Sequence, residues 1–326
     1  MRRWLMRIFA ILLMLCSSAY GAQQPVEVLR AVVKIRATVP EHASTAAILG
    51  TEREGSGVLI DTDGHVLTIG YLILEGDTIE VVGPDGKAVG ATFVAYDQES
   101  GFGIVRADQP VRVTPVKLGN SSLLSVGDPV LVVGHGGEES VQGARIISLQ
   151  EFAGYWEYLL DEAIFTSPPY ANFGGAALIG SDGRLLGVGS LYTNVTVPGF
   201  GPFPCNMFVP IDLLKPILED LLKLGRRRQP PRPWLGLQAE ETHGRVIVTR
   251  VTKGGPSENA GLESGDVILT VKEEKVQGLA DFYRKLWSVG QAGVQVPMRI
   301  LHGIEIRDVL IQSADRNSHL KVRPRK

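Results

Sequence analysis

The stretch that decides the fold is GSGVLIDTDGHVLT, residues 55–68. Two short apolar runs, residues 58–60 and 66–68, flank the turn-forming residues Asp61-Thr62-Asp63-Gly64. Glycine readily adopts the positive φ that such a turn requires, and an Asp-Gly pair between apolar runs is typical of a β-hairpin. We therefore predict two paired strands here, with His65 exposed at the turn.

The same pattern of short apolar runs separated by turn residues continues to about residue 210. The predicted strands are residues 79–82, 88–95, 130–133, 146–149, 176–179 and 185–188. Many short strands at regular spacing predict a barrel or a sandwich. The composition agrees, because 38 glycines and only 7% aromatic residues favour turn-rich β structure. Before the first hairpin, residues 26–39 predict a short helix or arm leading into a strand, and residues 40–54 a polar surface loop.

A helix and a linker divide the rest of the chain. Asp212 is placed to cap a helix whose apolar residues recur at helical spacing, and Gly225 ends it. Residues 226–233 hold four arginines and three prolines, which indicates a semi-extended linker. A second, small domain then has predicted strands at residues 246–251, 267–271, 294–301 and 306–311 and a helix at 281–287. We place the domains at residues 22–225 and 233–315, the linker at 226–232 and a basic tail at 316–326.

The first 21 residues have the pattern of a secretory signal peptide. Three arginines precede an unbroken apolar run at residues 8–16, and small residues lead to a predicted cleavage site after Gly21. The alternative is an uncleaved membrane anchor, but the run is well short of the roughly 20 residues that span a bilayer. Cleavage removes three positive charges and no negative ones, so the formal charge changes from −2 to −5.

Charge and cysteine content limit the partners to be expected. Nothing in the pattern predicts a nucleic-acid partner. The basic runs Arg226-Arg227-Arg228 and 316–326 are interpreted as solvated linker and tail charges, with contact to a membrane surface as the alternative. The six histidines and Cys205 show no metal-ligand spacing, so we expect neither a metal nor a cofactor. Cys205 is the only cysteine left after cleavage, so we expect no internal disulfide.

An ordered set of segments resembles the HtrA/DegP family of trypsin-like serine proteases. The first hairpin resembles the family's first protease hairpin, and residues 118–128 and 209–216 resemble its middle segment and its closing helix. Residues 169–175, PYANFGG, resemble the segment Asn-Pro-Gly-Asn-Ser-Gly-Gly that carries the family's nucleophile. The resemblance implies a mainly β fold, a trypsin-like double β-barrel followed by a PDZ domain.

All three catalytic positions implied by the resemblance hold unsuitable residues. Phe173 occupies the serine position, and a benzyl group has neither a lone pair for attack nor a proton to give up. Tyr71 occupies the position of the histidine base, and a phenol that titrates near pH 10 is a poor base at neutral pH. Gly101 occupies the aspartate position and has no side chain to orient an imidazole. We therefore predict a catalytically degenerate member, a pseudoprotease.

The alternative is an active serine endopeptidase with displaced catalytic residues. Ser167 lies six positions before Phe173, and the carboxylates of Asp97 and Glu99 are near the aspartate position in sequence. His135 lies in a loop and is interpreted as a residue without a special role. Nucleophile, base and orienting group must all meet within hydrogen-bonding reach, which this pattern does not predict.

Two features of the nucleophile segment each have two interpretations. Phe173 either plugs the old cleft or anchors a bound apolar peptide, and the plug is favoured. Gly174-Gly175 either shapes a nest of backbone amides or only preserves a tight turn, and the turn is favoured because conformational freedom is glycine's commonest role.

The second domain resembles an HtrA-type PDZ domain. Residues 255–262 and 264–268 resemble its signature, and Trp234-Leu235-Gly236-Leu237 resembles its carboxylate-binding loop. This implies binding of peptide C-termini or unfolded protein segments through Trp234, Leu235, Gly236 and Leu237. The alternatives are a PDZ fold used only for intramolecular packing and a purely structural subunit. The family also implies a periplasmic location in envelope protein quality control, and a homotrimer, formed around residues 26–35, or a hetero-oligomer with active relatives.

Overall fold

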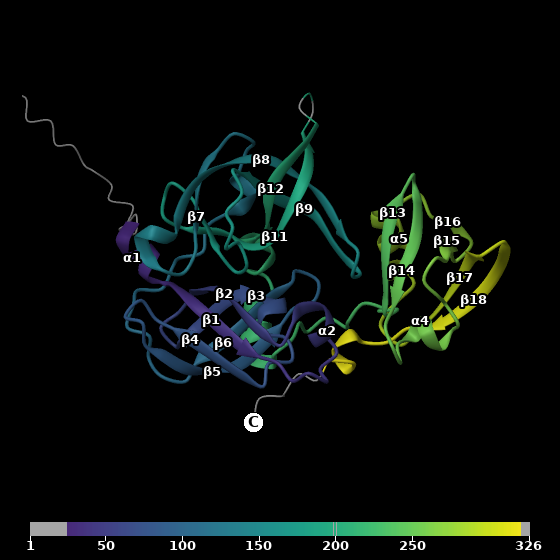
Figure 1. Ribbon diagram of the computed structural model, residues 1–326, viewed down its shortest axis with the longest axis horizontal. Helices are drawn as coiled ribbons and strands as arrows, with labels where there is room; N and C mark the ends of the chain where they lie inside the picture. The colour runs from purple at the N-terminus through teal and green to yellow at the C-terminus, as the bar shows by residue number, and fades with distance from the viewer. Residues whose placement is uncertain (1–24, 198, 200, 321–326) are drawn as a thin grey trace, which may run out of the picture.

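A computed structural model describes residues 25–197, 199 and 201–320 of the chain (Figure 1). The fold is mainly β, with two closed barrels followed by a separate sheet, as the sequence predicts. The predicted signal peptide, residues 1–21, lies outside the described residues, and so do residues 321–326 of the predicted tail.

The first barrel has the strand order β1-β2-β3-β6-β5-β4. Its strands are β1 (Val32–Thr38), β2 (Glu52–Leu59), β3 (His65–Ile69), β4 (Thr78–Val82), β5 (Ala88–Tyr96) and β6 (Phe102–Ala107). The hairpin at residues 55–68 is confirmed, and Gly64 has the expected positive φ of 85°. The helix α1 (Pro25–Arg30) leads into β1 as predicted, whereas residues 40–54 are more than a loop, since they hold the helix α2 (Ala46–Leu49) and the start of β2.

The second barrel has the order β10-β11-β12-β9-β8-β7. Its strands are β7 (Pro129–Val133), β8 (Val141–Gly154), β9 (Tyr158–Ser167), β10 (Ala177–Ile179), β11 (Leu185–Val197) and β12 (Gly201–Pro210). Buried residues of both barrels form one continuous apolar core, to which β1, β3, β9 and β12 all contribute. The long β8–β9 hairpin leaves the barrel and reaches the C-terminal domain (Figure 1).

The helix after the second barrel is shorter than predicted. Residues Ile211–Leu213 form a 3₁₀ turn, and the helix α3 runs from Leu218 to Leu224. Asp212 does not cap this helix; its carboxylate accepts a hydrogen bond from the Ser122 amide at 2.8 Å. Gly225 ends the helix as predicted, in a left-handed conformation.

The C-terminal domain is a sheet with order β13-β14-β15-β17-β18, with β16 paired to β15. Its elements are β13 (Leu237–Thr242), β14 (Arg245–Val251), α4 (Pro256–Asn259), β15 (Val267–Val271), β16 (Glu274–Lys275), α5 (Leu279–Ser288), β17 (Gln295–His302) and β18 (Glu305–Gln312). The helix α5 places Leu279, Phe282, Tyr283 and Leu286 in a core shared with the sheet. A residue of β9, Leu159, belongs to this core rather than to that of its own barrel.

The linker arginines are not all solvated, contrary to the prediction. The guanidinium of Arg227 makes two hydrogen bonds to the Asp97 carboxylate, at 2.5 and 2.7 Å. Arg232 makes an ion pair with Glu99 at 2.9 Å and lies over the Trp287 ring at 4.5 Å from its centroid. These contacts tie the linker to the first barrel and to α5, whereas Arg228 is solvated as predicted.

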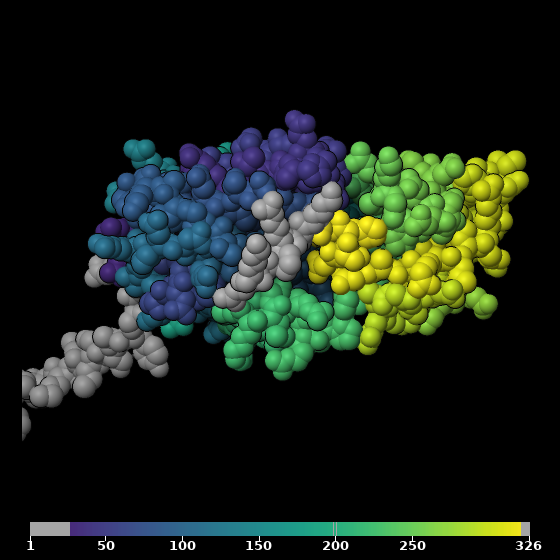
Figure 2. Space-filling view, turned by 90° about the horizontal axis from the view of Figure 1, so that it is seen from below, coloured from purple at the N-terminus to yellow at the C-terminus, as the bar shows by residue number. Residues whose placement is uncertain are grey.

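The prediction of a solvated tail is wrong for residues 316–320. Residues Arg316–Ser318 form a 3₁₀ turn, and the His319 ring lies 4.5 Å from that of Trp234, measured between centroids. Leu320 is buried in a cluster with Leu74 and Tyr96 of the first barrel. Figure 2 shows this C-terminal, yellow part of the chain between the blue barrel and the rest of the C-terminal domain. Among the described residues, no helix has the length and apolar character needed to cross a membrane.

Candidate functional site: Tyr71, Gly101, Phe173 and the loop of residues 235–237

Tyr71 lies between the two barrels. It sits in the 3₁₀ turn Gly70–Leu72 that follows β3, and its hydroxyl donates a hydrogen bond to the Ser190 carbonyl at 3.0 Å. The same hydroxyl lies 3.0 Å from the point where a side chain on Gly174 would begin. Burial raises the pKa of Tyr71 far above its ordinary value, so the phenol stays protonated and cannot act as a base.

Gly101 lies next to the turn that carries Tyr71. Its carbonyl accepts a hydrogen bond from the Gly70 amide at 2.7 Å, and its φ is 81°. A Cβ atom at this position would lie 3.4 Å from the hydroxyl of Tyr158, which itself donates to the Ser100 carbonyl at 2.6 Å. The Tyr158 hydroxyl therefore lies in contact with the point from which a side chain at position 101 would extend.

The nucleophile segment keeps a tight turn. Gly175 has a φ of 73°, and a Cβ atom there would lie 1.9 Å from the Ser56 carbonyl oxygen, so only glycine fits. The Gly175 amide donates to the Gly189 carbonyl at 2.9 Å, which favours the structural interpretation of the glycine pair. Phe173 is half-buried, so part of this residue stays accessible to solvent.

A serine–histidine–carboxylate chain lies beside this segment, and the sequence interpretation of His135 missed it. The Ser56 hydroxyl lies 3.0 Å from Nδ1 of His135 and accepts the His135 backbone amide at 3.0 Å. Nε2 of His135 lies 3.8 Å from the Glu54 carboxylate. Burial lowers the pKa of His135, which favours the neutral ring. Ser56 is 0% exposed, so no substrate carbonyl reaches its hydroxyl in this structure.

The other candidates for displaced catalytic groups are not brought together. The Ser167 hydroxyl donates to the Pro204 carbonyl at 3.4 Å. Asp97 is engaged by Arg227 and by Ser100, whose amide donates to its carboxylate at 2.9 Å. These contacts give Asp97 a structural role in holding the linker.

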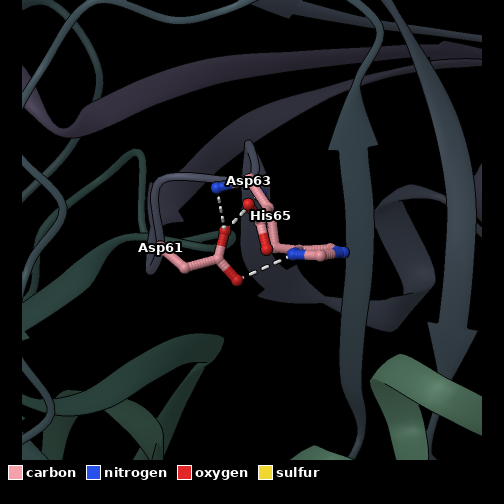
Figure 3. Close-up of side chains that lie close together, drawn as sticks. All are labelled: Asp61, Asp63 and His65. Carbon is pink, nitrogen blue, oxygen red and sulfur yellow. Dashed lines mark hydrogen bonds and ion pairs between the residues drawn. The ribbon is translucent and has the colours of Figure 1, made fainter.

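His65 is buried, not exposed as predicted. It is 8% exposed, and its Nδ1 lies 2.7 Å from one oxygen of Asp61 (Figure 3). The other oxygen of Asp61 accepts the backbone amides of Asp63 and His65, both at 3.0 Å. Asp61, Asp63 and His65 are the one group of candidate metal ligands within the described part of the chain, and the hydrogen bonds that the Asp61 carboxylate accepts account for their proximity as a turn.

The predicted carboxylate-binding loop holds a carboxylate that belongs to the chain itself. The amides of Leu235, Gly236 and Leu237 donate to the side chain of Glu157, at 2.9, 2.7 and 3.1 Å. Glu157 lies at the tip of the β8–β9 hairpin and is only 2% exposed. Burial raises its pKa to about 7, against the opposing effect of the three amide bonds.

The backbone of the hairpin tip also contacts the C-terminal domain. The Ala239 amide of β13 donates to the Tyr155 carbonyl at 2.9 Å. From the opposite side, the Tyr283 hydroxyl of α5 donates to the Gly154 carbonyl at 2.8 Å and lies 3.2 Å from the Glu157 amide. The tip thus lies between β13 and α5 and ends with a carboxylate in the loop.

Comparison with known proteins agrees with this architecture. The model of the trypsin-like peptidase domain matches residues 55–188, and that of the PDZ domain matches residues 233–312. A Haemophilus influenzae protein named as a periplasmic serine protease, do/HhoA-like, is 27% identical over 287 residues, 82% of this chain. The chain is a homologue of the HtrA-type serine proteases.

Two further HtrA-type proteins are similar in sequence to most of this chain. A Brucella suis protein named as a DegP-like periplasmic serine endoprotease is 27% identical over 72% of the chain, and a Lactobacillus helveticus serine protease Do-like HtrA is 25% identical over 74%. The matches cover 48% to 63% of these relatives' own length. Among solved structures, the HtrA-type protease AlgW with a decapeptide has a TM-score of 0.53 at 20% identity, covering 93% of this chain and all of that one. A Yersinia pestis serine endoprotease has a TM-score of 0.51 at 20% identity, covering 90% of this chain and 98% of that one.

Proposed function

We propose that this HtrA-type homologue is a pseudoprotease, which uses its protease fold for binding or assembly rather than hydrolysis. The observation that carries the proposal is the environment of Tyr71. Its phenol stays protonated and is bonded to the Ser190 carbonyl, at the position where the resemblance places the catalytic base. Phe173 and Gly101 at the other two positions offer neither a nucleophile nor a carboxylate.

The role we propose is binding of peptide C-termini or unfolded protein segments through the PDZ domain, in envelope protein quality control. Three backbone amides of residues 235–237 converge on one carboxylate, which is the chemistry that recognises a peptide terminus. The periplasmic location is supported by the names of the relatives and by the signal-like N-terminus. A homotrimer, or a hetero-oligomer with active relatives, is part of the same proposal by resemblance.

One observation favours a second candidate, an active endopeptidase with displaced groups. Ser56, His135 and Glu54 form a hydroxyl–imidazole–carboxylate chain close to the old nucleophile segment. Burial of Ser56 argues against it, because attack needs a motion that opens the hydroxyl to substrate.

The experiment that tests the proposed function combines hydrolysis and binding. The mature protein is incubated with casein and, separately, titrated with a labelled octapeptide that ends in leucine with a free carboxylate. We expect no cleavage of casein, and binding of the octapeptide that is lost when its carboxylate is amidated. Casein cleavage that disappears in Ser56→Ala would replace the proposal by the second candidate.

A further inference from the structure

We propose that the tip of the β8–β9 hairpin, residues 154–158, is a resident intramolecular ligand that keeps the PDZ carboxylate-binding loop closed to peptide termini. This inference rests on the proposed peptide-binding function and deepens it. It names the group with which a peptide must compete, and it makes the protease-like domain a regulator of the PDZ domain.

The first argument is the match between the tip and a bound peptide. A peptide ligand of a PDZ domain pairs with a strand edge and places its terminal carboxylate on the loop amides. Here the Tyr155 carbonyl accepts the Ala239 amide of β13, and the Glu157 carboxylate accepts the amides of residues 235–237. A side-chain carboxylate has replaced the terminal one, with the same acceptor atoms.

The second argument is that the tip also supplies an apolar side chain. Leu159, two residues after Glu157, is 9% exposed and belongs to the buried cluster that contains Leu235, Leu237 and Phe282 of the PDZ domain. A carboxylate followed by an aliphatic side chain in the domain core is the pair of features that a peptide ending in leucine offers. The ligand class that competes is therefore a C-terminal peptide with an aliphatic last residue.

The third argument concerns how firmly the tip is held. Arg284 of α5 makes ion pairs with Glu151 on one strand of the hairpin and Asp161 on the other, at 2.5 and 2.7 Å. All three side chains are well exposed, and such exposed pairs contribute little. Glu157 itself has a φ of 58°, a left-handed conformation that is unfavourable for a residue other than glycine. The tip is thus an ordered ligand with unfavourable features, which suits a displaceable latch.

The test uses the full mature chain with a substitution that removes the internal carboxylate. Glu157→Ala abolishes it, and Glu157→Gln keeps the shape while setting an NH₂ group against the loop amides. Tyr283→Phe removes only the hydroxyl that contacts the Gly154 carbonyl and the Glu157 amide, and it serves as a second variant if the Glu157 variants fold poorly. Glu162→Gln is the matched control, an exposed carboxylate on the same strand β9. Readouts are hydrogen exchange of the amides of residues 235–237 and the affinity of the labelled octapeptide ending in leucine.

We expect the loop amides to be protected in the wild type and in Glu162→Gln, and to exchange at least tenfold faster in Glu157→Ala. The octapeptide should bind Glu157→Ala at least tenfold more tightly than the wild type, with a smaller gain in Tyr283→Phe, because the binding-competent fraction rises. Equal exchange rates in the wild type and Glu157→Ala, or equal peptide affinities above the detection limit, would overturn the inference. Faster exchange in Glu157→Ala without binding of the octapeptide to any variant would support the internal ligand and contradict the proposed peptide-binding function.

Discussion

The hydroxyl of Tyr71 donates a hydrogen bond to the carbonyl of Ser190 at 3.0 Å. Tyr71 follows β3 of the first barrel, whereas Ser190 belongs to β11 of the second, so the bond joins the two barrels. A catalytic base placed there would have to face the nucleophile position. The tyrosine is instead a half-buried connection between the two barrels, which gives this position a structural role.

Restoring the three family residues should not restore hydrolysis. In Tyr71→His/Gly101→Asp/Phe173→Ser, the new aspartate must adopt a φ near 81° and begins 3.4 Å from the Tyr158 hydroxyl. We expect casein cleavage to stay at background, with the fold checked by circular dichroism. Cleavage that is sensitive to an organophosphonate would show instead that the cleft kept its catalytic geometry and lost only its chemistry.

A fluorophosphonate probe should label no serine of the wild-type protein between pH 6 and pH 9. Ser56 is sealed from solvent, and Ser167 donates to a backbone carbonyl, not to a histidine. Mass spectrometry of the intact protein and its peptides measures the labelling. Adduct formation that is lost in Ser56→Ala, but kept in Ser167→Ala, would establish an active Ser56–His135 pair.

Local patterns predicted many short strands in a barrel or a sandwich, and the resemblance to the HtrA family implied the double barrel. Alternating apolar runs and the Asp-Gly turn gave the first hairpin, and Gly225 gave the end of a helix. Strands such as β9 were missed, since its first three residues and residues 163–166 are all buried and no simple alternation marks it. Signals of this kind depend on neighbours two to four residues away, and they fail when both faces of a strand are covered.

The contacts that matter most for the site could not be predicted, because they join residues far apart in sequence. Glu157 reaches amides 78 to 80 positions later, and Ser56 meets His135 across 79 positions. Arg227 and Asp97 are 130 positions apart. Nothing near Glu157 in sequence distinguishes it from a solvated turn glutamate, and only the direction of the β8–β9 hairpin brings it to the loop.

Loss of the Arg227 side chain should destabilise the protein far more than loss of its neighbour. Asp97 is 4% exposed, so Arg227→Ala leaves a buried charge unpaired and should lower the free energy of unfolding by about 2–4 kcal/mol. Arg228 is the matched control, because it is 75% exposed and paired with Asp220. Arg228→Ala should change the free energy of unfolding by less than about 0.5 kcal/mol. Urea denaturation followed by tryptophan fluorescence gives both values. Equal effects would mean that the Arg227–Asp97 pair does not hold the linker.

Substituting Gly175 and Gly86 distinguishes two reasons for a glycine: lack of space for a side chain at Gly175, and a left-handed backbone alone at Gly86. Both have φ near 74°, but a Cβ at Gly175 would lie 1.9 Å from the Ser56 carbonyl, whereas nothing lies within 4 Å of one at Gly86. Gly86→Ala should cost about 1–2 kcal/mol for the left-handed backbone alone. Gly175→Ala should cost at least about 3 kcal/mol, because a backbone segment must also move. Thermal denaturation compares the two, and a similar loss for both would show that the nucleophile turn is easily rearranged.

Peptide binding by the wild-type protein should strengthen as the pH rises from 5 to 8. The pKa of Glu157 is about 7 in the docked hairpin and returns toward its ordinary value of 4.5 when the tip is released. The docked state therefore binds more protons in this window, and raising the pH favours release. The groups that face Glu157 are the Arg316 guanidinium and the Tyr283 phenol of α5, whose pKa burial raises well above its ordinary value, so that the phenol stays neutral in this window.

The equilibrium constant for release of the hairpin tip from the loop should rise by about two orders of magnitude between pH 5 and pH 8, and it should level off above pH 8. Fluorescence anisotropy with the octapeptide ending in leucine measures it, since a terminal carboxylate with a pKa of about 3.5 stays ionised throughout. Glu157→Gln leaves every other side chain unchanged, including His319 beside Trp234, so the affinity of this variant for the peptide should be nearly independent of pH. A pH dependence of equal size in both proteins would assign the effect to another group and leave Glu157 as a contact that does not respond to pH.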